Sequence, residues 1–284
     1  MNRHEIYIHP SVEITRGVID VIDDLDHCLN RPEDTEKNIH RIRVDIKRLR
    51  GWIRLVRDRP GEREWQIIDH GLRDMAKQLS VNRDEQIIPV TLGWLKDKTK
   101  NKDAQASISR IDSYVQSGSC GYLFDWKAIN PLDRNVLEML KRKTLLSYSD
   151  EVIRKGLQRT YKRALKCGLQ ACSPEGTFAA LHRLRKWVKY FYYQLEFVEV
   201  LYADDYKKIR QQLDMLGKGL GKIHDLVFVK NRLQRMPGAA DCANDINIAG
   251  MAADREINKL LKRTRRSFRK IFNMKPRKIA ASLQ

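Results

Sequence analysis

The sequence predicts an all-α protein built from two related halves, each with enough helices for one four-helix bundle. Between breaks that contain Pro or Gly, apolar residues recur every three or four positions, which is the period of an amphipathic helix. A basic pattern that begins at His40 returns at His182, 142 positions later in a chain of 284 residues. Hydrophobic residues make up 42% of the chain, so each half can bury a core. We therefore expect residues 1–142 to form one bundle and residues 143–284 the other.

Four helices are expected in the first half. Helix starts are marked by proline, which fits the first helical turn, and helix ends by runs such as Arg59-Pro60-Gly61. The expected helices run from Pro10 to about Asn30, from Pro32 to about Asp58, from Glu62 to about Leu79, and past Asp84 toward Lys96.

The second half begins after a polar stretch from Lys98 to Gly121, which we interpret as a connection. Pro131 starts the helix that leads into the second copy of the repeat. There, Ser173-Pro174-Glu175 is typical of an N-cap, a first helical position and an acidic first turn. Met236-Pro237-Gly238 should end that copy, and a strongly basic last helix is expected from about Asp254 to Asn273.

The repeated helix has two different faces. We assign to the core an apolar stripe made of Ile42, Ile46, Leu49, Ile53 and Val56, and in the second copy of Leu184, Val188, Phe191, Leu195 and Val198. An adjacent face of the first copy carries only basic residues, at steps of three and four: His40, Arg43, Lys47, Arg50, Arg54 and Arg57. Like charges at this spacing destabilise a helix, and Asp45 lies on another side. A bound anion would relieve the repulsion, so we interpret the row as an anion site rather than a solvated face.

The second copy repeats the plan with less charge. His182, Arg185 and Lys189 match the first three basic positions, but Tyr192 and Glu196 stand where the first copy has arginines. Further matches occur at an offset of 141, where Lys77, Leu79, Arg83 and Asp84 return as Lys218, Leu220, His224 and Asp225. Basic residues in the preceding helix could compensate for the lost charge: Arg159, Lys162, Arg163 and Lys166. We therefore predict one shared basic site built by two unequal halves.

The excess of basic residues favours anionic binding partners. The chain has 55 Lys and Arg against 36 Asp and Glu, a net charge of +19, which attracts polyanions of any kind. Its five cysteines form no CxxC pair, so neither a disulfide framework nor a zinc knuckle is indicated, and a reducing, cytoplasmic compartment is expected. The sequence also indicates no export signal, and we expect no membrane partner.

These patterns resemble the CHAD family, the conserved histidine α-helical domain. The matching features are the two His-x-x-Arg-x-x-x-Lys patterns, the basic-Asp pairs Arg83-Asp84 and His224-Asp225, the duplication, and Tyr193 with Glu196. The resemblance implies one CHAD domain of two four-helix bundles, related by a pseudo-twofold axis around a basic central groove or pore. It also implies binding of inorganic polyphosphate and association with polyphosphate granules. Family members often accompany a triphosphate tunnel domain, for which we expect no room here, so no catalysis is carried over.

We thus expect a non-catalytic binder of inorganic polyphosphate without a cofactor. The predicted polyphosphate-binding residues are His40, Arg43, Lys47, Arg50, Arg54, Lys77, Arg83, His182, Arg185, Lys189, Lys218, Lys222 and His224.

Two other functions stay open at this point. RNA or DNA is the alternative ligand, because Tyr190, Tyr192 and Tyr193 fall on the polar side of their helix and could stack on bases. The third class is chemistry at the histidines, either metal chelation or acceptance of a phosphoryl group to form phosphohistidine. It is disfavoured because Arg and Lys surround each histidine and would repel a divalent cation.

Overall fold

In the computed structural model, residues 10–30, 35–57, 62–79, 81–118, 132–145, 148–199, 203–236 and 239–279 are described. These residues form α-helices, and no strand occurs among them. The prediction of an all-α protein is confirmed. None of the helices in this part of the chain is both long and hydrophobic enough to cross a membrane.

The first half contains more helices than expected. In chain order they are α1 (Pro10–Asn30), α2 (Thr35–Val56), α3 (Glu62–Gln78), α4 (Val81–Lys98), α5 (Lys102–Gly118) and α6 (Leu132–Thr144). Helix α5 occupies the polar stretch that was interpreted as a connection. Its start is capped by the Asn101 side chain, which accepts a hydrogen bond of 3.0 Å from the backbone N–H of Ala104. Its narrow apolar stripe, with Ile108 and Ile111 buried, packs on α10.

The second half contains α7 (Asp150–Cys172), α8 (Phe178–Glu199), α9 (Ala203–Leu233), α10 (Ala243–Ile271) and the short α11 (Pro276–Ile279). Helix α8 starts later than the sequence predicted, because Ser173 is the C-cap of α7. The N-terminal cap of α8 is Thr177, whose hydroxyl accepts a 3.2 Å hydrogen bond from the N–H of Ala180. Helix α10 begins at Ala243 and not near Asp254.

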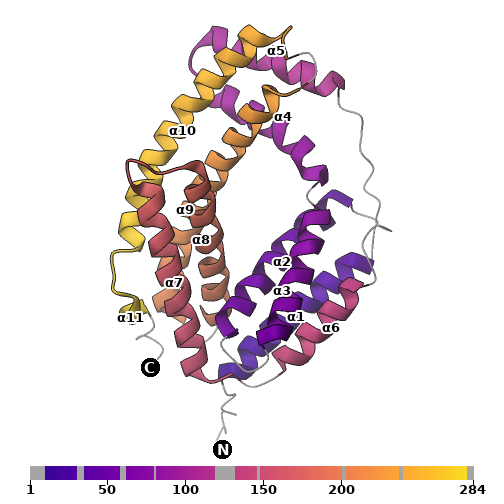
Figure 1. Cartoon of the computed structure of the whole chain (residues 1–284), viewed down its shortest axis with the longest axis vertical. Coiled ribbons are helices and arrows are strands. Elements are labelled where there is room, and N and C mark those ends of the chain that lie inside the picture. The colour runs from indigo at the N-terminus through magenta and orange to yellow at the C-terminus, as the bar shows by residue number, and fades with distance from the viewer. Residues whose placement is uncertain are drawn as a thin grey trace, which may run out of the picture.

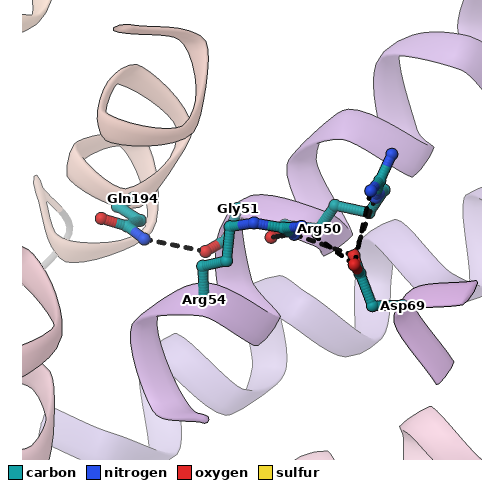
Figure 2. A network of polar contacts seen from close by, with 5 residues as sticks. All are labelled: Arg50, Gly51, Arg54, Asp69 and Gln194. Carbon is teal, nitrogen blue, oxygen red and sulfur yellow. Dashed lines mark hydrogen bonds and ion pairs between the residues drawn. The ribbon is translucent and has the colours of Figure 1, made fainter. Parts of the chain in front are cut away.

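The two repeated helices, α2 and α8, pack against each other and join the two halves of the molecule. Helices α1 and α3 flank α2, α7 packs on both α2 and α8, and α4 and α5 arch away to pack on α9 and α10 (Figure 1). The crossing of α2 and α8 is close, since a Cβ added at Gly51 would lie 3.1 Å from the Cβ of Tyr193. There the buried Gln194 side chain donates a 3.0 Å hydrogen bond to the Gly51 carbonyl (Figure 2).

One contiguous core includes buried residues of both halves. Trp52 of α2 is fully buried and makes edge-to-face contacts with Tyr148 and with Phe197 of α8. Such aromatic pairs contribute about 0.5–1.5 kcal/mol each beyond their buried area. The packing therefore fixes α2 and α8 relative to each other, and with them the polar side chains that both helices present.

Candidate functional site

A cationic groove of about 430 Å³ runs between α2, α3 and α8. Seven Lys or Arg side chains and a single carboxylate line it, so its electrostatic potential is positive. The lining residues are Lys47, Arg50 and Arg54 of α2, Asp69, His70 and Arg73 of α3, and His182, Arg185, Lys186, Lys189 and Tyr190 of α8.

Helix α2 contributes to the groove with the face that the sequence predicted. Its apolar stripe, from Ile42 to Val56, is buried, so Lys47, Arg50 and Arg54 on the adjacent face are directed away from the core. The assignment of faces is confirmed for this part of the helix.

The carboxylate of Asp69 lies between two of these arginines. The Nε of Arg50 donates to Asp69 Oδ1 at 2.8 Å, and Arg54 donates from Nη1 and Nη2 at 2.8 and 2.9 Å (Figure 2). Burial acts to raise the pKa of Asp69, but the hydrogen bonds from Arg54 and Arg50 lower this pKa to about 2. The row itself carries no carboxylate, as the sequence predicted, but α3 supplies one to Arg50 and Arg54, so part of the repulsion is relieved without a bound anion.

On α8, Arg185 and Lys189 lie against a glycine face of α9. A Cβ at Gly221 would lie 3.5 Å from the Nε of Arg185, and one at Gly217 would lie 3.1 Å from the Cε of Lys189. The Nζ of Lys189 lies 3.7 Å from Asp214, which also pairs with Lys218 at 2.7 Å. Burial lowers the pKa of Lys189, Asp214 acts to raise it, and Arg185 lowers it further.

Charges from the two halves meet across the groove. Burial lowers the pKa of Lys186 on α8, and repulsion from Arg54 and Arg50 on α2 lowers it further. The guanidinium of Arg54 also lies over the ring of Tyr190, 4.2 Å from its centroid. Side chains of α2 and α8 thus contribute to one electrostatic environment.

At one end of the groove, His182 lies beside His224, with ring centroids 5.3 Å apart. Burial lowers the pKa of His182, as do His224, Arg185 and Lys186. Both histidines line a second, mostly apolar cavity of about 220 Å³ that adjoins the groove.

Six of the thirteen predicted site residues line the groove, and the others are placed elsewhere or lie outside the described side chains. Arg43 donates a 2.7 Å hydrogen bond to the Leu79 carbonyl. Lys222 lies over Trp94 of α4, 4.3 Å from the ring centroid. Lys218 pairs with Asp214, and His224 lines the adjoining cavity. His40 and Lys77 are exposed, and the Arg83 side chain lies outside the part that the structure describes.

Sequence reasoning missed five lining residues: Asp69, His70, Arg73, Lys186 and Tyr190. The spacing of Asp69, Arg73 and Lys77 at steps of four was the available signal on α3. Of the tyrosines expected on the polar side of this helix, Tyr190 and Tyr193 are buried, which leaves little ring surface for stacking on bases.

The basic residues of α7 form a separate site. Arg159, Lys162, Arg163 and Lys166 line another cavity, of about 450 Å³, together with Lys155 and Gln158. Among the described residues, no group of three or more His, Cys, Asp or Glu is placed to hold a metal ion.

Comparisons with known proteins agree with this architecture. A profile of the CHAD domain family matches residues 15–234. Among solved structures, the chain is similar to one described as the crystal structure of the CHAD domain from the plant Ricinus communis. The identity is 17%, the TM-score is 0.62, and the match covers 91% of each chain, which shows a common fold. No match was found among curated proteins.

Proposed function

The chain belongs to the CHAD domain family, and we propose that it binds inorganic polyphosphate in the groove between α2, α3 and α8. The family is one associated with polyphosphate binding. The observation that carries the proposal is the groove lining, in which seven Lys or Arg side chains surround one carboxylate. A row of arginine forks and lysine ammonium groups matches the phosphate oxygens of a linear chain.

The charges of the groove favour an anionic ligand. Burial and neighbouring cations lower the pKa of Lys186, and burial lowers that of Lys189, so both ammonium groups lack full compensation of their charge. A phosphate chain would supply negative charge and charge-assisted hydrogen bonds, each worth about 1.5–3 kcal/mol. Binding should therefore raise the pKa of both lysines.

We propose that both halves share the groove around a pseudo-twofold axis. The expected division into one bundle per half does not match the packing, because α4 and α5 of the first half pack on α9 and α10 of the second. Contacts between α2 and α8 support the axis because they are reciprocal. Arg48 pairs with Glu196, the repeat counterpart of Arg54, while Arg54 stacks on Tyr190, the counterpart of Arg48. Reciprocal contacts between equivalent positions are typical of a twofold relation.

Binding is proposed to occur without catalysis. Asp69, the one carboxylate that lines the groove, has a pKa of about 2 because Arg54 and Arg50 hold its charged form against the effect of burial. A group with so low a pKa is a poor general acid or base near neutral pH.

A cytoplasmic location, with association to polyphosphate granules, belongs to the same proposal. The location rests on the cysteine pattern of the sequence, which contains no CxxC pair.

The proposal is tested by titrating long-chain polyphosphate calorimetrically at two salt concentrations. The first variant combines Lys47→Ala, Arg185→Ala and Lys189→Ala, which removes three groove cations from both halves. The matched control combines Lys155→Ala, Lys162→Ala and Lys166→Ala, which removes the same charge from the α7 cavity.

We expect the groove variant to lose at least about 100-fold in affinity and to show a shallower salt dependence, because fewer phosphates are contacted. The control should lose only a few-fold. Equal losses in the two variants, or no binding by the unaltered protein at low salt, would contradict the proposal.

A further inference from the structure

The second cavity differs in chemistry from the groove that it adjoins. His182 lines both the cavity and the groove, so the cavity and the groove adjoin at this residue. The cavity holds about 220 Å³, less than the roughly 300–1,000 Å³ of a pocket for a whole drug-sized ligand. It therefore suits one part of a ligand whose remainder lies in the groove. Its lining residues are Phe178, Leu181, His182, Leu220, Ile223, His224, Val227, Phe228 and Asn231.

The lining suits a flat aromatic group with polar edges. The Phe178 side chain is 51% exposed at the start of α8, although large aromatic residues usually gain by burial. Phe228 and the two histidine rings add further aromatic surface, and Asn231 adds one amide. Nucleobases bind to such surroundings by stacking on aromatic rings and by hydrogen bonds to an amide side chain.

The lining of the cavity belongs to the second copy of the repeat. In the first copy the sequence counterparts of Phe178, His224 and Val227 are Glu36, Arg83 and Gln86, whereas Leu181, Leu220 and Phe228 correspond to the apolar Ile39, Leu79 and Ile87. The copies therefore differ at the aromatic mouth and the polar edge of the lining, while its apolar floor is common to both. Inorganic polyphosphate has the same charged unit along its whole length and no apolar part. The chemical difference between the two copies therefore indicates a ligand that is itself different at its two ends.

Helix α8 places the aromatic residues of the cavity and the cations of the groove along one line. Phe178, His182, Arg185 and Lys189 follow at steps of four, three and four, so they share one face of the helix. At a rise of 1.5 Å per residue, Arg185 lies about 10 Å and Lys189 about 16 Å beyond Phe178 along the axis. A base beside Phe178 would thus have its ribose near His182 and its phosphates beside Arg185 and Lys189.

We propose that the cavity binds the base of a nucleoside oligophosphate whose phosphates occupy the adjoining end of the groove. This inference rests on the proposed function, because it uses the groove as the phosphate site. It adds a second ligand class that shares the phosphate chemistry of the first.

The test compares the affinities of ATP and inorganic tripolyphosphate, measured by calorimetry in the same buffer without divalent metal. Both probes carry three phosphates, and tripolyphosphate has the greater charge, so electrostatics alone would favour tripolyphosphate. We expect ATP to bind about 5- to 100-fold more tightly, which is the range that stacking of one base supplies.

Phe178→Ala should remove this ATP preference and leave the affinity for tripolyphosphate unchanged. The matched control is Leu169→Ala on α7, which truncates a side chain of similar exposure, 61%, and which lies outside the lining of the cavity. It should change neither affinity. Saturation-transfer NMR on the unaltered protein gives a second measurement, with stronger transfer expected to the base protons of ATP than to its ribose protons.

The outcomes distinguish failure of the base site from failure of polyphosphate binding in the groove. Equal or weaker binding of ATP than of tripolyphosphate, or an ATP preference that survives Phe178→Ala, would overturn the base site and leave polyphosphate binding in place. Failure of ATP, tripolyphosphate and long-chain polyphosphate alike to bind would overturn both.

Discussion

The two halves of the molecule balance the charge of their repeated helices in different ways. On α3, Asp69 pairs with Arg50 and Arg54, and Arg73 lines the groove one turn later. On α9 the order is reversed, because the counterparts of Asp69 and Arg73 are Arg210 and Asp214.

Accordingly, the second half pairs Asp214 with Lys189 and Lys218, while Arg210 lies beside Glu199 and Tyr192. The carboxylate thus occupies positions one helical turn apart in the two copies, while both halves still line the groove with cations. For Arg50, Arg54 and Lys189 the balancing carboxylate comes from a neighbouring helix, whereas Lys218 pairs with Asp214 within α9.

The largest expected effect comes from removing the cations of each half in turn. Lys47→Ala with Arg73→Ala removes two from the first half, and Arg185→Ala with Lys189→Ala removes two from the second. If both halves contact one phosphate chain, each pair should weaken polyphosphate binding by about 10- to 100-fold at low salt, since each lost contact costs about 1.5–3 kcal/mol before compensation. Calorimetric titration measures the affinity of each double variant for polyphosphate. A loss of affinity in only one of the two variants would show that one half alone contacts the chain.

The next effect concerns the two carboxylates. Asp69→Asn should destabilise the protein by about 2 kcal/mol near neutral pH, because Arg54 and Arg50 lower the pKa of the Asp69 side chain, which is only 23% exposed, to about 2. Since this pKa is depressed, the stabilisation is complete above pH 3.8 and is lost as the pH falls toward 2. Urea unfolding at pH 7 and near pH 2 should therefore show a difference between variant and unaltered protein that disappears in acid.

Asp214→Asn is the control for that change. Its closer partner Lys218 is 75% exposed, and its contact with the less exposed Lys189 is long, at 3.7 Å, so the loss of stability should be well under 1 kcal/mol. Both variants should bind polyphosphate a few-fold more tightly, because each removes a negative charge that competes for groove cations. A cost in stability that is equal for the two variants would show that the halves are balanced alike.

The smallest effect is the pH dependence at the histidine end of the groove. Burial, His224, Arg185 and Lys186 lower the pKa of His182, so this ring gains its charge only below about pH 6.5. Acidification from pH 8 to 5.5 should tighten polyphosphate binding a few-fold, and His182→Gln should reduce that gain. Weakening on acidification, together with sensitivity to a chelator, would indicate metal-bridged binding instead, because protonated imidazole cannot ligate a metal.

The sequence predicted those parts of the fold that depend on local pattern. The helical period located α1 to α4 and the apolar stripe of α2, which is buried as expected. Helix α5 was missed because its apolar stripe is narrow and its polar face dominates the composition. The start of α8 was misplaced because Ser173 and Thr177 are both acceptable caps, and only packing decides between them.

The site was predicted in part for the same reason. Six of the proposed residues line the groove, since periodicity identifies the exposed face of a helix. Asp69 and Arg73 were missed because their role depends on which helix packs beside α2, which no local pattern contains. The burial of Tyr190 and Tyr193 follows likewise from the close crossing of α2 and α8 at Gly51.

A crystal structure of the protein with a short-chain polyphosphate tests the shared groove most directly. We predict one continuous chain of phosphates between α2 and α8, in contact with Lys47 on one side and with Arg185 and Lys189 on the other. A chain that contacts cations of only one half, or that lies in the cavity formed by Lys155, Lys162 and Lys166 on α7, would contradict the account.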